Sequence, residues 1–76
     1  MVDALVRLEA PQDGILTVTM ADAESGNALG EAMVHALRDG FQRAADDATV
    51  RAVVLAGEGA VFSSGAPREL LLRFAR

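Results

Sequence analysis

The segment from Ser63 to Pro67 (Ser-Ser-Gly-Ala-Pro) has the residue types of a loop that could bind an oxyanion through its backbone. Gly65 tolerates a sharp turn, and Pro67 suits the first turn of a helix because its missing N–H would be unpaired there in any case. Such a helix start presents free backbone N–H groups with the positive end of the helix dipole behind them. An ordinary loop that enters a helix has the same pattern, so both interpretations stay open at this point.

His35 is the single histidine and invites a general-base interpretation. Helical phase places it on a polar face, one turn away from Glu31 and from Asp39. No catalytic partner is assembled around it, so we predict a solvated surface position.

The acidic and glycine-rich segments lack the spacing of a ligand site. Asp46 and Asp47 with Glu58 do not follow a metal-loop pattern, so no metal site is predicted. Gly57-Glu58-Gly59 resembles a dinucleotide loop, but Phe62 stands at the third glycine position and the segment is predicted to be a turn. Ser63 and Ser64 lack the surroundings of a nucleophile elbow and are interpreted as wall or capping residues.

Two short strands are predicted at the start of the chain. Leu5, Val6 and Leu8 form the first, and Pro11-Gln12-Asp13-Gly14 has the composition of a turn. Residues 15–20 alternate Thr with larger apolar residues, which predicts a half-buried strand in a hairpin with the first.

A helix is predicted from Ala28 to Ala45, with Asn27 as its N-cap. Its apolar residues recur every fourth position, and Gly40 lies within that stripe. Because Gly costs about 1 kcal/mol in a helix interior, we expect a close approach to the sheet there. The stripe residues are Leu29, Met33, Leu37 and Phe41.

Arg51 to Ala56 contains an unbroken apolar run, which predicts a parallel strand covered on both faces. Strand, helix and strand form a βαβ unit, and a further helix is expected from Pro67 to Arg76. The fold class is therefore α/β with the order ββαβ, within a single domain over residues 1–76. Such a sheet leaves strand edges that would pair with another segment.

Composition narrows the class of protein. The 76 residues include no Cys and carry a net charge of −4, which argues against disulfides and against nucleic-acid binding. No apolar run is long enough for a membrane span, and the chain is expected to be soluble and cytoplasmic. The content is 51% hydrophobic, more than so short a chain buries easily, so we expect association with another surface.

An ordered set of short motifs then resembles the start of the enoyl-CoA hydratase/isomerase (crotonase) superfamily. The resemblance runs through almost the whole chain but covers only the opening of a family domain, so we expect an incomplete spiral fold. The motifs are Asn27-Ala28-Leu29, Phe41-x-x-Ala44-x-x-Asp47, Val50-Arg51-Ala52-Val53-Val54-Leu55-x-Gly57 and Phe62-Ser63-Ser64-Gly65-Ala66.

The resemblance implies acyl-thioester chemistry in which backbone N–H groups stabilise a thioester enolate. The Ala66 N–H would be one oxyanion donor, with Ala28, Ser64 and Gly65 around the coenzyme A or phosphopantetheine arm. It implies no cofactor, an acyl-CoA or acyl carrier protein thioester as partner, and a trimer or hexamer. The second donor and the catalytic acid or base would lie outside this chain, in the rest of the domain or a second chain.

Pro67 departs from the Asp found in most family members, and Arg68-Glu69-Leu70 follows it. This is similar to crotonase-like enzymes of polyketide β-branching, which dehydrate or decarboxylate carrier-bound intermediates, and it makes Arg68 a candidate contact for an anionic group. The alternative is a non-catalytic module that binds a partner chain or a carrier protein.

Overall fold

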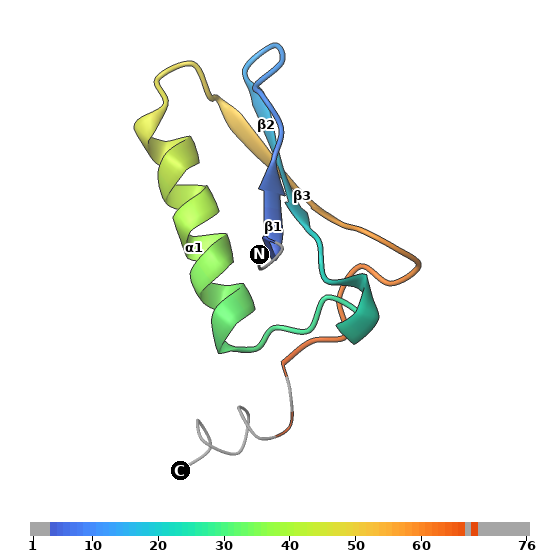
Figure 1. The fold of residues 1–76 in the computed structure, drawn as a ribbon. Coiled ribbons are helices and arrows are strands. Elements are labelled where there is room, and N and C mark those ends of the chain that lie inside the picture. Colours follow the sequence, from blue (N-terminus) through green and yellow to red (C-terminus); the bar gives the residue numbers. More distant parts are fainter. Residues whose placement is uncertain (1–3, 67, 69–76) are drawn as a thin grey trace.

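The computed structural model describes residues 4–66 and Arg68. These residues form β1 (Val6–Leu8), β2 (Ile15–Met20), a short 3-10 helix η1 (Ala23–Ser25), α1 (Glu31–Asp46) and β3 (Ala52–Gly57), as Figure 1 shows. The predicted α/β class and the order ββαβ are confirmed. The predicted helix over 67–76 falls outside the described residues apart from Arg68, which is exposed.

The strands form one sheet in the order β1-β2-β3. β1 runs antiparallel to β2 through the predicted turn, where Gln12 and Ile15 exchange backbone hydrogen bonds of 3.0 and 2.9 Å. Asp13 and Gly14 have φ angles of 54° and 81°, which Asp-Gly adopts readily in a two-residue hairpin turn. β3 runs parallel to β2, which the α1 crossover makes possible.

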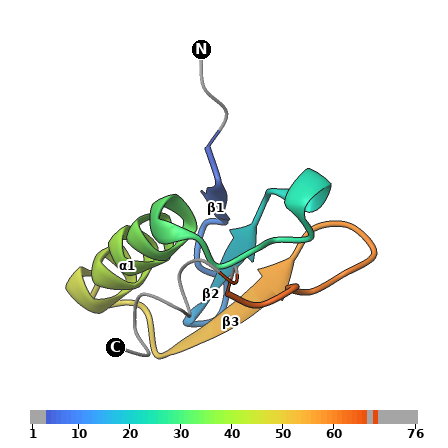
Figure 2. The ribbon, with the colours of Figure 1, turned by 90° about the horizontal axis from the view of Figure 1, so that it is seen from below.

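The core lies between α1 and the sheet, with α1 packed against one sheet face (Figure 2). Buried Leu16 and Val18 of β2 contact Ala44 of α1, and Val6, Leu8, Leu37 and Val50 pack around them. The predicted close approach at Gly40 is confirmed, because a Cβ there would stand 3.3 Å from Leu8 and 3.5 Å from Val18. No helix of the described segments is long and apolar enough to cross a membrane.

Helix α1 begins later than predicted, and Asn27 is not its cap. The N-cap is Gly30, without a side-chain hydrogen bond, and the first helical residue is Glu31 rather than Ala28. Asn27 has a left-handed φ of 54°, whereas an N-cap residue takes an extended conformation. Its side chain bonds instead to the loop that follows β3. His35 is exposed, as predicted.

Burial is distributed differently from the prediction for β2 and β3. Thr19 of β2, expected to be half-exposed, is buried, whereas Val53, Val54 and Leu55 of β3 are 40%, 48% and 37% exposed. The reason is strand order: β2 is the central strand, and β3 is an edge strand of the described sheet. Val61 and Phe62, which follow β3, form no strand.

Replacing Gly40 by Val tests the packing of α1 on the sheet. The added methyl groups would be forced against Leu8 and Val18, so we expect the free energy of unfolding to fall by about 1–3 kcal/mol in chemical denaturation. Gly40→Ala is the matched control and should have a smaller effect, because its single methyl needs only the flexible end of Leu8 to move and improves helix propensity. Equal stabilities for Gly40→Val and the unchanged protein would contradict this packing.

Candidate functional site

Two loops meet at the end of the sheet from which β2 and β3 exit. One, residues 21–30, contains η1 and leads into α1, and the other, residues 58–66, follows β3 (Figure 1). The carboxyl ends of parallel strands are the usual place for a ligand site in α/β proteins.

Asn27 joins these two loops from within. Its side chain is fully buried (0% exposed), and its amide nitrogen donates to the backbone carbonyls of Glu58 at 2.9 Å and Val61 at 3.0 Å. Its side-chain oxygen accepts a hydrogen bond from the backbone N–H of Asp22 at 2.9 Å. The two loops are thus held together by one amide group.

The second loop also bonds directly to the first. The Ser63 hydroxyl donates to the Asn27 carbonyl at 2.8 Å, and the Ser64 N–H donates to the Gly26 carbonyl at 2.7 Å. The Ser64 hydroxyl reaches the Ser25 carbonyl at 3.2 Å. Residues 63–65 therefore lie alongside residues 25–29.

Both polar backbone groups of Gly65 are occupied. Its N–H donates to the Ser63 hydroxyl oxygen at 3.0 Å, and its carbonyl accepts from the Leu29 N–H at 2.9 Å. In a trans peptide the C=O and N–H point in opposite directions, so the Ala66 N–H is directed away from Leu29. Among the residues that the structure describes, the Ala66 N–H has no hydrogen-bond acceptor.

The structure brings Ala28, Ser64, Gly65 and Ala66 into this one region, as the candidate site requires. The Ala28 N–H is engaged by the Ser25 hydroxyl at 3.2 Å, so it contributes to loop structure. Gly65 has a φ of 86°, and no atom of the described residues lies within 4 Å of the place where a Cβ would stand. Sequence reasoning missed the roles of Asn27, and of Ser63 as an acceptor for Gly65.

The turn after β3 is fixed by packing and by an ion pair. Glu58 donates its N–H to the Met20 carbonyl at 2.8 Å, and its carboxylate pairs with Arg7 of β1. Gly57 faces the backbone of the same loop, and a Cβ there would clash with the Phe62 carbonyl oxygen. Only glycine therefore allows the chain to fold back toward Asn27.

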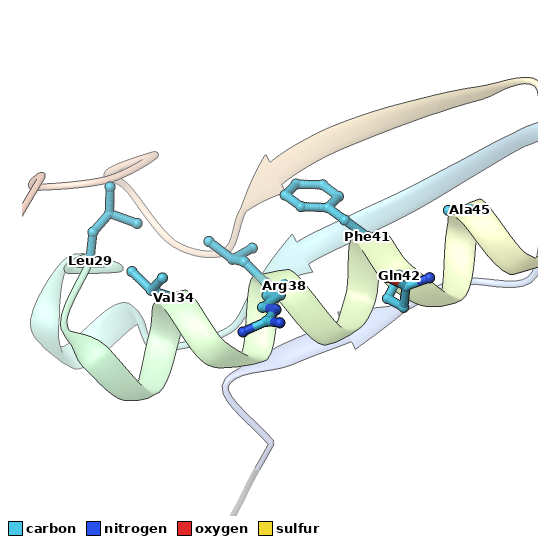
Figure 3. Close-up of a pocket in the computed structure, with 7 residues that line it drawn as sticks. Leu29, Val34, Arg38, Phe41, Gln42 and Ala45 are labelled. Atoms are coloured by element: carbon cyan, nitrogen blue, oxygen red, sulfur yellow. The ribbon is translucent and has the colours of Figure 1, made fainter.

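An apolar groove of about 530 Å³ lies along α1, between Leu29 and Ala45 (Figure 3). Its first residue, Leu29, is the one whose N–H binds Gly65, so the groove begins beside the candidate site. Arg38 and Gln42 add polar groups. The remaining lining residues are Val34, Leu37 and Phe41.

The acidic residues form no cluster for a metal ion in the described ranges. The carboxylate of Asp47 accepts hydrogen bonds from the Thr49 hydroxyl at 2.6 Å and its N–H at 2.9 Å. These bonds hold the pKa of Asp47 below its usual value. Asp47 therefore closes the turn after α1.

Comparison with known proteins decides the family, because the sequence model of enoyl-CoA hydratase/isomerase matches residues 10–73. The chain belongs to the enoyl-CoA hydratase/isomerase family. Rat enoyl-CoA hydratase domain-containing protein 3 is 35% identical to this family member over 54 residues, which are 71% of the chain and 18% of the rat protein. A probable enoyl-CoA hydratase of Mycobacterium leprae is 33% identical over 57 residues, covering 71% of the chain and 23% of that protein.

Solved structures of the crotonase superfamily share the fold. A variant of the ECH2 decarboxylase domain of CurF from Lyngbya majuscula has a TM-score of 0.82 at 36% identity, over 97% of this chain and 30% of that one. An enzyme of a dehydratase/decarboxylase couple in polyketide beta-branching has a TM-score of 0.81 at 30% identity, over 93% and 31%. This family member thus spans less than a third of the relatives it matches.

Replacing Gly57 by Ala tests the contact between the turn after β3 and the rest of its loop. The new methyl group must displace the Phe62 backbone, so we expect a loss of about 1–3 kcal/mol in stability. The signals of the Asn27 side-chain amide should also shift in NMR spectra. Gly30→Ala, where a Cβ would meet no described atom within 4 Å, is the control and should leave those signals in place. Unchanged Asn27 signals in Gly57→Ala would show that this turn does not position the loop.

Proposed function

We propose that the Ala66 N–H is one donor of an oxyanion hole that stabilises the enolate of an acyl thioester. The observation that supports this proposal is the hydrogen bond that fixes the orientation of the Gly65–Ala66 peptide. The Leu29 N–H donates to the Gly65 carbonyl, and the N–H on the opposite side of the same peptide has no acceptor among the described residues. A donor fixed before the reaction needs no reorganisation as negative charge develops on the thioester oxygen.

The substrate arm is coenzyme A or phosphopantetheine in this proposal. Ala28, Ser64 and Gly65 form the wall beside the thioester, where glycine lets the ligand approach the backbone. Exposed Arg68 contacts an anionic group of the substrate or carrier. Since one N–H does not complete an oxyanion hole, the second donor and the acid or base lie outside the described residues.

The likeness to a decarboxylase domain and to a dehydratase/decarboxylase couple supports elimination or decarboxylation as the reaction, and the likeness to enoyl-CoA hydratases supports hydration. In decarboxylation the C–C bond to the carboxylate breaks and CO2 leaves. The electron pair of that bond passes into the thioester as an enolate, which is then protonated at carbon. The Ala66 N–H would stabilise that enolate oxygen.

A pair of ligands tests the oxyanion donor. Butyryl-CoA has a thioester carbonyl, whereas S-butyl-CoA has the same chain and carrier without that oxygen. We expect the Ala66 amide proton to move downfield in NMR spectra with butyryl-CoA only. The same shift with both ligands, or no shift with either, would contradict the assignment.

An ester in place of the amide between Gly65 and Ala66 removes the proposed donor without changing a side chain. It should weaken butyryl-CoA binding while leaving S-butyl-CoA binding unaltered, and an ester at exposed Ala60 is the control. In the complete enzyme, loss of this donor should lower turnover by about 10²–10³-fold. Equal butyryl-CoA affinities with and without the Ala66 N–H would refute the role.

The second candidate function is a module that binds another polypeptide, and the exposed β3 supports it. Val53, Val54 and Leu55 lie on an edge strand that can accept a further strand. Homo-oligomers, as the family resemblance implies, are one way to cover this surface.

We expect sedimentation velocity to show concentration-dependent association of the unchanged chain. Val54→Glu should shift the chain toward the monomer, because it places a charge on an apolar surface that is 48% exposed. His35→Glu, on the exposed side of α1, is the control. A monomer at every concentration would exclude self-association through β3.

A further inference from the structure

We infer that Asn27 is a positioning residue for the Gly65–Ala66 peptide, which it orients through hydrogen bonds to both loops. This inference rests on the proposed function in one respect, namely that the Gly65–Ala66 peptide binds the oxygen of an acyl thioester. Its structural part, the dependence of the peptide on Asn27, stands on the contacts alone.

The side chain of Asn27 meets a set of demands that only asparagine satisfies. Its nitrogen supplies both protons, to the carbonyls of Glu58 and Val61, while its oxygen accepts from Asp22. The group is fully buried, so water cannot replace a lost partner. The left-handed φ of 54° also suits Asn better than most residues.

The backbone of Asn27 is also linked by hydrogen bonds to Gly65, the residue before the proposed donor Ala66. Its carbonyl accepts the Ser63 hydroxyl, whose oxygen in turn accepts the Gly65 N–H. Two residues after Asn27, the Leu29 N–H holds the Gly65 carbonyl. Hydrogen bonds thus link the N–H of Gly65 (through Ser63) and its carbonyl (through Leu29) to the loop that contains Asn27.

Replacing Asn27 by Asp separates positioning from simple packing. Aspartate keeps the shape and the acceptor for Asp22 but loses both donors, and it sets a carboxylate against the carbonyls of Glu58 and Val61. The second loop should move away, which frees the Leu29 N–H and lets the Gly65–Ala66 peptide turn.

The experiment follows amide hydrogen exchange of Leu29, with Val18 as a reporter of the buried core. In Asn27→Asp we expect Leu29 protection to fall by at least about tenfold relative to Val18. Binding of butyryl-CoA should weaken while S-butyl-CoA binding changes less. Thr49→Ala, which removes a surface hydrogen bond beyond the far end of α1, is the control and should change neither measurement.

Ser63→Ala is the second variant and covers the case in which Asn27→Asp unfolds. It removes the link between the Asn27 carbonyl and the Gly65 N–H on a loop outside the core. Faster exchange at Gly65 with a protected Val18 supports the inference. Unchanged Leu29 and Gly65 exchange in folded variants would overturn it.

The two proposals fail in different ways. If butyryl-CoA does not bind the unchanged chain, the oxyanion role fails, but loss of Leu29 protection in Asn27→Asp still establishes positioning. If butyryl-CoA moves the Ala66 signal equally in both chains, the oxyanion role stands and the positioning role of Asn27 fails.

Discussion

The hydrogen bond from the Leu29 N–H to the Gly65 carbonyl sets the direction of the peptide on which the candidate site depends. Because a trans peptide carries its two polar groups on opposite sides, a donor at one end leaves the Ala66 N–H facing away. Leu29 itself is held at the entry to α1, two residues before the first helical residue. The orientation of the Ala66 N–H therefore depends on the junction between the loop and α1, where Leu29 lies.

A site made of backbone atoms imposes its requirements on residues that never touch the ligand. Gly57 must lack a side chain because the Phe62 carbonyl oxygen occupies the space, and Asn27 must supply two protons and one acceptor in a buried pocket. The Arg7–Glu58 ion pair adds a tie between β1 and the turn after β3, although exposed ion pairs contribute little stability. Packing and buried hydrogen bonds are the main restraints.

Much of the fold was accessible from sequence because its signals are local. Alternation in residues 15–20 and the Asp-Gly turn predicted the hairpin, and Gly40 in an apolar stripe predicted close contact with the sheet. The position of Ser64, Gly65 and Ala66 near Ala28 followed from the family resemblance. Their proximity is observed in the structure, while their roles toward a thioester stay predictions.

Errors arose where long-range contacts override local preference. Asn before a helical pattern usually caps the helix, yet Asn27 finds partners 31 and 34 residues away and takes a left-handed conformation instead. The apolar run in β3 predicted a strand covered on both faces, but β3 lies at the edge of the described sheet and Val53, Val54 and Leu55 are partly exposed. The pattern of apolar residues indicates which faces of a strand can be buried, but it does not indicate which segment covers them.

A crystal structure of this chain with bound butyryl-CoA tests the central claim most directly. The account predicts the thioester oxygen about 3 Å from the Ala66 nitrogen, with the Gly65 carbonyl still bonded to the Leu29 N–H. A thioester bound elsewhere, or an Ala66 N–H turned toward a protein acceptor, would contradict it.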